Sequence, residues 1–295
     1  MFRKNLTISV ITFLLAANGL LFAMDWPLPD AVVIKNFGFN DQRTPIIGTM
    51  LTGEGPVSAT GSGELIFSAS VNDTASRLPS PLGAWSAVAH SDGLVSVYSR
   101  YKDEGRGNKP GYMESGNQLA ASGVSGWSRN NGVYYILYDR RERRWVNALM
   151  VTTLPQDTSE PHILSAQLQN MNNRANNRTL DSGVIRNISQ GRYFIVVNAT
   201  DALLAPKGPQ LAPHRILCSV NGEEIGSLSF DTMSAKDGVL MVNRNGPVPA
   251  KRVYAPYPAF EIGEVQLNRG QANLEIIVRD IAGNSRSTLT RIIVD

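Results

Sequence analysis

The chain has 295 residues, 42% of them hydrophobic and 18% charged, a composition that is typical of a globular protein and excludes a disordered chain or a coiled coil. The formal net charge is +3, and Arg3 and Lys4 supply two of the positive charges, so we expect no nucleic-acid partner. The single cysteine, Cys218, excludes an internal disulfide framework and any CxxC metal or redox motif.

Residues 1–23 have the pattern of a secretory signal peptide. A basic start at Arg3 and Lys4 precedes a largely apolar run that ends at Ala23. Polar residues dilute this run, which makes it a poor stop-transfer anchor, and no later segment reaches the ~20 apolar residues of a membrane helix. We expect cleavage after Ala23, with an uncleaved anchor as the alternative. The mature chain should have no transmembrane span and should be exported to the periplasm or cell envelope of a bacterium.

Short alternating or β-branched runs dominate the rest of the chain. Each run is bounded by Gly, Pro, Asn, Asp or Ser, which supply turn geometry. No window of 12 or more residues after the signal shows a sustained helical period of apolar residues, so we predict an all-β fold. The predicted strands fall at Ala31–Phe37, Gly63–Ala69, Trp85–His90, Leu94–Tyr101, Gly132–Tyr138, Trp145–Val151, His162–Leu168, Tyr193–Ala199, Arg215–Val220, Glu223–Phe230, Ala272–Asp280 and Ser287–Val294.

A polar connector with two prolines, residues 152–161, separates two sets of predicted strands. We therefore predict a signal peptide at 1–23, a first domain at 24–155 and a second domain at 156–295.

The second domain has the pattern of an immunoglobulin-like β-sandwich of about seven short strands. Asn221 and Gly222 lie between two strand runs and form a two-residue hairpin signal. Near the C-terminus, an alternating strand leads into Asp280-Ile-Ala-Gly-Asn284 and then a last strand, which resembles the final hairpin of bacterial Ig-like modules. Such modules mostly position or bind, and the fold alone does not name their partner.

Six groups of short fragments follow one another in the first domain. They are Asn36-Phe-Gly-Phe39; Thr44-Pro-Ile-Ile-Gly48; Gly55-Pro-Val-Ser-Ala59 with Gly63; Ala87-Val-Ala-His-Ser-Asp-Gly-Leu94 with Val97-Tyr-Ser-Arg-Tyr101; Gly116-Asn-Gln-Leu-Ala-Ala-Ser-Gly123; and Gly132-Val-Tyr-Tyr-Ile-Leu-Tyr138 with Trp145-Val-Asn-Ala-Leu149. In this order they resemble the lysostaphin-like (LytM-type) zinc metallopeptidases, which cut peptidoglycan cross-bridges. The resemblance covers about residues 35–151 and implies a lysostaphin-like antiparallel β-sheet domain.

The residues at the family's zinc positions do not match the family. Catalytic zinc needs three protein ligands and an open water position. In the alignment, the three ligand positions fall on Thr44, Gly48 and Tyr135. The two histidines that assist the attacking water fall on Arg100 and Val133, and neither residue is a general base near neutral pH. We therefore expect no catalytic residue, no bound metal and no cofactor.

Histidine is too scarce for an alignment error to restore the zinc site. The chain holds only His90, His162 and His214, so a His-based site would have to gather residues from both domains. His90 matches a family position that is not a ligand, and we interpret it as a structural residue.

We expect the chain to retain the substrate groove of the resembled peptidases, with Arg100, Trp127 and Tyr135 as its candidate residues. The two-residue period of a strand divides the neighbouring side chains between two faces. One face carries Val133, Tyr135 and Leu137, and the other carries Tyr134, Ile136 and Tyr138.

The resulting hypothesis is a secreted cell-envelope pseudopeptidase that binds peptidoglycan or regulates a cell-wall hydrolase. The resemblance implies this role, because related degenerate domains activate cell-wall amidases. One alternative is an active zinc endopeptidase of the same family that cuts peptidoglycan cross-bridges. A second alternative is a structural periplasmic protein.

Overall fold

A computed structural model of the chain describes residues 24–71, 80–105, 107–152, 157–172, 177–180, 183–203 and 208–295. The predicted signal peptide lies outside these residues. The elements described are strands and two short 3-10 turns, η1 (Ala148–Met150) and η3 (Ala250–Arg252), which confirms the predicted all-β class. No helix among the described residues is long and apolar enough to cross a membrane.

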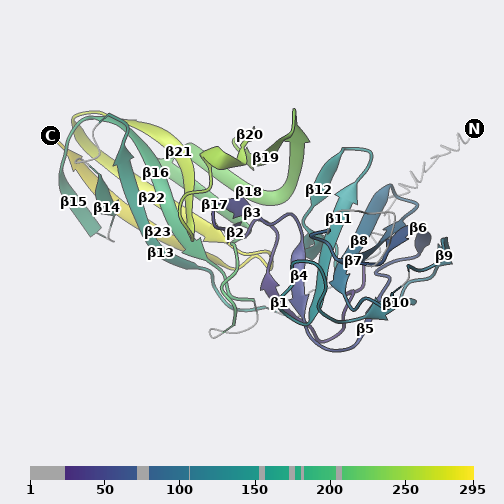
Figure 1. The fold of residues 1–295 in the computed structure, drawn as a ribbon. Coiled ribbons are helices and arrows are strands. Elements are labelled where there is room, and N and C mark those ends of the chain that lie inside the picture. Colours follow the sequence, from purple (N-terminus) through teal and green to yellow (C-terminus); the bar gives the residue numbers. More distant parts are fainter. Residues whose placement is uncertain are drawn as a thin grey trace, which may run out of the picture.

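The first lobe, residues 24–152, is built on an antiparallel sheet (Figure 1). Its strands follow the spatial order β1-β4-β11-β8-β7-β6-β9, while β5 and β10 form a separate pair. The strand bounds are β1 (Val32–Lys35), β2 (Asn40–Asp41), β3 (Thr44–Pro45), β4 (Thr49–Thr52), β5 (Pro56–Ser58), β6 (Gly63–Ala69), β7 (Ala84–Ala89), β8 (Leu94–Tyr101), β9 (Gly111–Met113), β10 (Gln118–Ala121), β11 (Gly132–Asp139) and β12 (Arg144–Val146).

The second lobe, residues 157–295, has two sheets that share one apolar core. One sheet has the order β14-β13-β16-β21, and the other runs β15-β23-β22-β17-β18, with β19 paired to β18 and β20 paired to β19. The strand bounds are β13 (His162–Asn170), β14 (Arg178–Leu180), β15 (Gly183–Ile188), β16 (Gly191–Thr200), β17 (Arg215–Val220), β18 (Glu223–Lys236), β19 (Val239–Arg244), β20 (Pro247–Pro249), β21 (Ala259–Leu267), β22 (Gly270–Arg279) and β23 (Ser285–Val294). The immunoglobulin-like topology stays a prediction.

One hydrogen-bonded sheet runs through both lobes. Strand β12 pairs with β11 on one side and with β18 on the other, with Trp145 opposite Met233. The Trp145 ring also lies 5.9 Å from the ring of Tyr138 on β11. The two lobes are therefore joined by backbone pairing as well as by the connector, and the predicted domain boundary at 155/156 stays a prediction.

The loop between β1 and β3 belongs to the first lobe in sequence but packs into the second. Phe37 is fully buried in the core of the second lobe. Asn36 Nδ2 donates to the Ala212 carbonyl at 2.8 Å, and the Ala212 amide donates back to Asn36 Oδ1 at 2.8 Å. Figure 1 accordingly draws β2 and β3 at the second lobe, where β3 contacts η3. The segment from Asn36 to Gly48 carries the first two fragments of the peptidase resemblance, and Phe37, Phe39 and Ile47 pack it against the core of the second lobe.

Candidate functional site

The aligned ligand position Gly48 lies directly against strand β11. A Cβ atom on Gly48 would come within 2.4 Å of the Tyr135 carbonyl oxygen. It would also lie 2.8 Å from Ile136 Cγ1 and 2.9 Å from Tyr134 Cε2. Real Cβ atoms do not approach other atoms so closely, so the volume that a ligand side chain would need at position 48 is already filled.

The side chains on β11 that face Gly48 are those of Tyr134 and Ile136. Val133 and Tyr135 point to the opposite face, where both are buried in the core of the first lobe. The alternation predicted for β11 is therefore present. The structure does not bring the side chains of Val133 and Tyr135 to Gly48, as the alignment expects, because alternate residues of a strand point to opposite faces.

Arg100, at the end of β8, covers the Tyr134 ring. Its guanidinium carbon lies 4.7 Å from the ring centroid, and its backbone φ is +65°, a conformation uncommon outside glycine. Burial lowers the pKa of Arg100, while Tyr134 and Asp41 favour its charged form. Burial also raises the pKa of the Tyr134 phenol to about 12. The pair therefore consists of a cation and a neutral phenol near neutral pH, and neither group serves as a general base there.

Thr44, the remaining ligand position, is an exposed residue of β3 paired with Asp41 on β2. Asp41 forms an ion pair with Lys35 at 2.8 Å. Thr44, Gly48, Tyr134 and Ile136 supply no imidazole, thiolate or carboxylate, which are the groups that hold catalytic zinc. These residues do not fit the metal of the resembled peptidases.

Two of the three candidate groove residues meet at one loop. The Arg100 amide donates to the Leu82 carbonyl at 2.8 Å, and the Trp127 amide donates to the Pro81 carbonyl at 3.2 Å. The Trp127 side chain is 73% exposed. Tyr135 is fully buried and lines no open surface, so its assignment to the groove is wrong.

The Tyr135 hydroxyl belongs to a buried polar network that the sequence alone does not reveal. It lies 3.0 Å from Thr60 Oγ1 and 3.1 Å from Ser96 Oγ. The Tyr98 hydroxyl lies 2.9 Å from the same Thr60 oxygen and also accepts a hydrogen bond from the Thr60 amide at 2.8 Å. Burial raises the pKa of both tyrosines, so both remain neutral hydrogen-bonding groups. No local pattern predicts this network, since its members come from β8, from β11 and from the loop between β5 and β6.

His90 joins this network as a structural residue. Its Nδ1 lies 2.9 Å from the Ser62 carbonyl and its Nε2 lies 2.7 Å from Ser96 Oγ. A His–Ser pair can activate a nucleophile. Here, however, Ser96 is fully buried and His90 is 7% exposed, so a substrate cannot reach the Ser96 oxygen.

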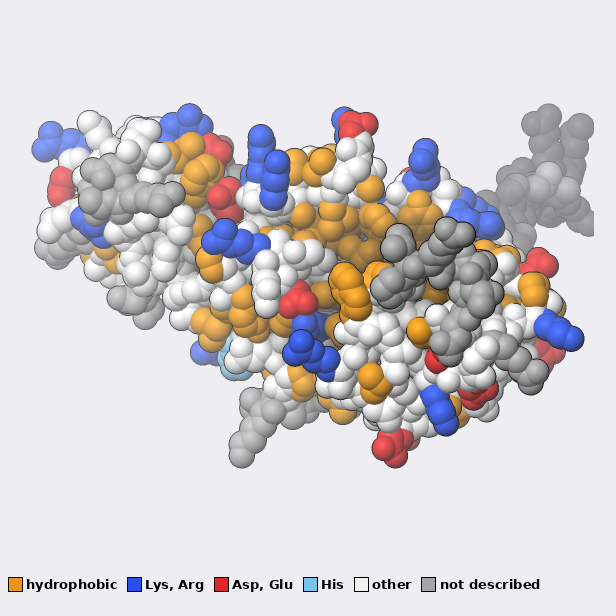
Figure 2. Space-filling model, viewed as in Figure 1, with side chains coloured by type: hydrophobic (Ala, Val, Ile, Leu, Met, Phe, Trp, Pro, Cys, Tyr) orange, Lys and Arg blue, Asp and Glu red, His pale blue; other side chains and the backbone are white. Residues whose placement is uncertain are grey.

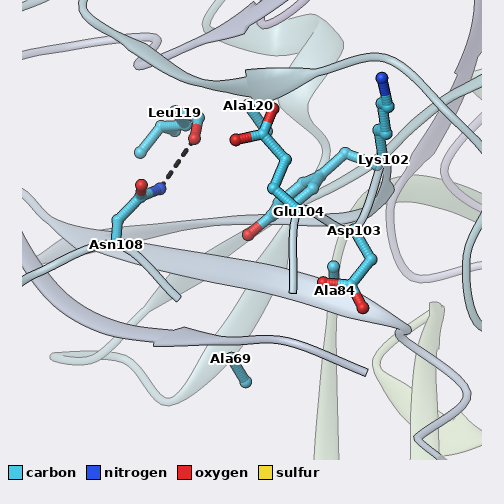
Figure 3. Close-up of a pocket in the computed structure, with 9 residues that line it drawn as sticks. Ala69, Ala84, Lys102, Asp103, Glu104, Asn108, Leu119 and Ala120 are labelled. Atoms are coloured by element: carbon cyan, nitrogen blue, oxygen red, sulfur yellow. Dashed lines mark hydrogen bonds between the residues drawn. The ribbon is translucent and has the colours of Figure 1, made fainter. Parts of the chain in front are cut away.

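The first lobe has a small polar cavity near the end of β8 (Figure 3). Its volume is about 20 Å³, which is room for one water molecule and too little for a substrate. Asp103 and Glu104 line it, and Asn108 Nδ2 donates to the Leu119 carbonyl at 2.7 Å. The cavity can therefore hold a water molecule beside the loop, but it is too small to be a catalytic site.

A larger cavity of about 360 Å³ opens in the second lobe between β13 and β23. Leu164 and Thr288 are among its lining residues, and Arg286 is the charged residue of that lining. Its volume suits a small ligand, but one charged residue does not define a ligand class.

On the face drawn in Figure 2, Lys and Arg side chains are scattered, and hydrophobic side chains gather near the middle.

Comparison with known proteins gives the following likenesses. A family model without a descriptive name matches residues 160–295, and no curated protein matches the chain. The catalytic domain of the prophage-encoded M23 protein EnpA from Enterococcus faecalis is 21% identical, with coverage of 41% of this chain and 90% of that one and a TM-score of 0.33.

Two further solved structures are similarly distant. A zinc-containing peptidase from Vibrio cholerae is 21% identical over 45% of this chain and 41% of that chain, with a TM-score of 0.35. The antimicrobial peptidase lysostaphin from Staphylococcus simulans is 14% identical, with coverage of 66% of this chain and 76% of that chain and a TM-score of 0.28. These TM-scores are too low to indicate a shared activity.

Proposed function

We propose that this chain acts in the bacterial cell envelope by binding wall material or a wall hydrolase, and that it does not hydrolyse peptidoglycan. One observation supports the proposal that the chain does not hydrolyse peptidoglycan. The Tyr134 ring and the Ile136 side chain occupy the volume in front of Gly48, and Arg100 covers the Tyr134 ring. A catalytic metal works by lowering the pKa of its bound water to about 7. The groups at this place offer neither a metal ligand nor a replacement base.

The fragments that resemble the lysostaphin-like peptidases support a role at the cell wall. They persist at Asn36–Phe39, Gly55–Ala59 and Gly116–Gly123 although the ligand positions differ from the family. The signal-peptide pattern of residues 1–23 supports export to the compartment where wall polymers lie. Cell fractionation tests the location, and recovery of the mature chain in the cytoplasm would contradict it.

The exposed Trp127 beside the Arg100 loop supports binding to wall material. An aromatic ring offers a flat apolar face for a sugar ring or a peptide side chain, and a guanidinium pairs with carboxylate or phosphate. Both residues are anchored on the same short segment, by bonds to Pro81 and Leu82. We assign the contact surface to Trp127 and its neighbours rather than to Tyr135.

Co-sedimentation with purified peptidoglycan tests this assignment. The Trp127→Ala variant should lose most of the retention shown by the unaltered chain. Tyr112→Ala is the matched control, since Tyr112 is also 73% exposed but lies on the edge strand β9. Equal retention of the two variants would contradict the assignment of the contact surface to Trp127. If the chain binds neither wall material nor an envelope hydrolase, the structural-protein alternative replaces this proposal.

A further inference from the structure

Three aspartates from distant parts of the sequence converge in the second lobe. Asp157 lies in the connector that enters this lobe, Asp201 directly follows β16, and Asp280 directly follows β22. Each offers a carboxylate oxygen, and these oxygens all lie within 4.8 Å of one another. The tertiary fold, not a local motif, creates this cluster.

All three carboxylates are buried. Asp157 is 8% exposed, Asp201 is 3% exposed and Asp280 is 2% exposed. None of them forms an ion pair with Lys, Arg or His among the described residues. Buried charges of one sign are stable only when they are neutralised by protons, by a cation or by a metal.

The Asp157 carboxylate has an unused oxygen inside the protein. Its Oδ1 accepts a hydrogen bond from the Ser159 amide at 3.0 Å, while its Oδ2 is inaccessible to water and has no hydrogen-bond partner. Because more than nine-tenths of Asp157 is buried, this oxygen has lost its hydration without a replacement. A ligand in the middle of the cluster would supply the missing partner.

Asn284 holds the cluster in place. Its Nδ2 donates to Asp280 Oδ2 at 2.7 Å and to the Asp157 carbonyl at 3.1 Å, and its backbone amide donates to Asp280 Oδ1 at 2.8 Å. This one side chain therefore connects the turn after β22 to the connector. The carboxylates are oriented by the fold and do not depend on a ligand for their approximate positions.

Burial and mutual repulsion disfavour the charged forms of the carboxylates in the cluster. Burial, followed by the charges of Asp280 and Asp157, raises the pKa of Asp201 to about 7. Burial and the charge of Asp157 also raise the pKa of Asp280.

We propose that Asp157, Asp201 and Asp280 form a Ca²⁺-binding site that fastens the connector to the second lobe. Ca²⁺ binds oxygen ligands at 2.3–2.6 Å in flexible geometry. Two oxygens on opposite sides of such an ion lie up to about 5 Å apart, in agreement with the limit of 4.8 Å in this cluster. The absence of His and Cys from the cluster disfavours zinc, and Mg²⁺ demands stricter octahedral geometry and keeps more of its water.

Thermal unfolding of the purified full chain tests the site. After treatment with a chelator and its removal, addition of millimolar CaCl₂ should raise the melting temperature by roughly 5 °C. The same concentration of MgCl₂ should produce a smaller shift. Isothermal titration with CaCl₂ should give about one site per chain.

The variants Asp157→Asn and Asp280→Asn should weaken Ca²⁺ binding on the order of tenfold or more, since affinity follows the number of charged ligands. Glu160→Gln is the matched control, because Glu160 lies near Asp157 in sequence but pairs with the exposed Arg286. It should bind Ca²⁺ as the unaltered chain does. Circular dichroism identifies any variant that fails to fold, and Asp201→Asn then takes its place.

Two results would overturn the proposal. One is an unaltered chain whose melting temperature and heat of titration do not respond to CaCl₂. The other is a Ca²⁺ response that persists unchanged in well-folded Asp157→Asn and Asp280→Asn chains. An unresponsive chain whose Asn variants are more stable would show that shared protons neutralise the cluster. None of these results depends on whether the first lobe binds the cell wall.

Discussion

Gly48 and Tyr135 are in backbone contact, and a Cβ atom at position 48 would lie 2.4 Å from the Tyr135 carbonyl oxygen. This contact leaves no room at position 48 for the side chain of a metal ligand, which the alignment with the resembled peptidases would place there. The residue at 48 is small because strand β11 passes directly over it, with the Tyr134 ring on the side where a ligand would project. Packing as well as residue type therefore supports the proposal that position 48 holds no metal ligand.

Replacing Gly48 with Asp should not create a zinc site. The new side chain meets a backbone oxygen, which cannot move out of the way as a flexible side chain can. We expect a loss of roughly 1–3 kcal/mol in unfolding free energy from overpacking, measured by urea denaturation, with no zinc found by elemental analysis. Gly111→Asp is the control, because a Cβ atom at position 111 would meet no atom within 4 Å. Stoichiometric zinc in the Gly48→Asp chain would contradict this account.

Tyr135→Phe should destabilise the first lobe without altering binding to peptidoglycan. Removing the hydroxyl leaves Thr60 and Ser96 short of one buried hydrogen-bond partner. The expected cost is about 1–3 kcal/mol, measured by chemical denaturation alongside co-sedimentation. Tyr112→Phe on the exposed edge should be nearly neutral. If the variant binds less peptidoglycan while its stability is unchanged, the prediction is wrong and Tyr135 belongs to the contact surface.

Phe37→Ala should destabilise the second lobe, although Phe37 lies in the first part of the chain. Its ring is fully buried in the core that also contains Phe230 and Ile216. The expected loss is about 3–5 kcal/mol. Hydrogen exchange should accelerate in β17 and β18 more than in β7. Phe67→Ala, at a 45% exposed position, is the control, and equal acceleration in both lobes would contradict the assignment.

The Asp231–His214 pair should make stability depend on pH in acid. The hydrogen bond from His214 holds the pKa of Asp231 below its usual range. A depressed carboxyl pKa stabilises the fold above the unfolded-state value of about 3.9, and that contribution disappears as the pH falls through the folded-state pKa. Asp231→Asn should therefore be less stable than the unaltered chain at pH 7, and the difference should shrink below about pH 4. Urea unfolding at several pH values measures this, and a constant difference would contradict it.

Local patterns in the sequence predict the strands better than they predict how the strands meet. The alternation in β11 correctly separates Val133 and Tyr135 from Tyr134 and Ile136. A motif alignment, however, cannot decide which of the two faces meets Gly48, because a shift of one residue leaves the letters almost as well matched.

Long-range pairing has no local signature. The contact of Trp145 with Met233 joins the two lobes, and Phe37 enters a core whose other members follow much later in the chain. The cluster of Asp157, Asp201 and Asp280 likewise depends on three separate chain segments. Each of these residues looks ordinary beside its sequence neighbours, so only the folded chain reveals its role.

Digestion of purified peptidoglycan in the presence of added ZnCl₂ tests the central claim most directly. The measured quantity is the release of new amino groups and soluble peptides over time, with a lysostaphin-type peptidase as the positive control. The packing of Tyr134 and Ile136 over Gly48 predicts release equal to that of the buffer alone. Zinc-dependent release above the buffer, lost on chelation and restored by ZnCl₂, would contradict it and establish the active-peptidase alternative.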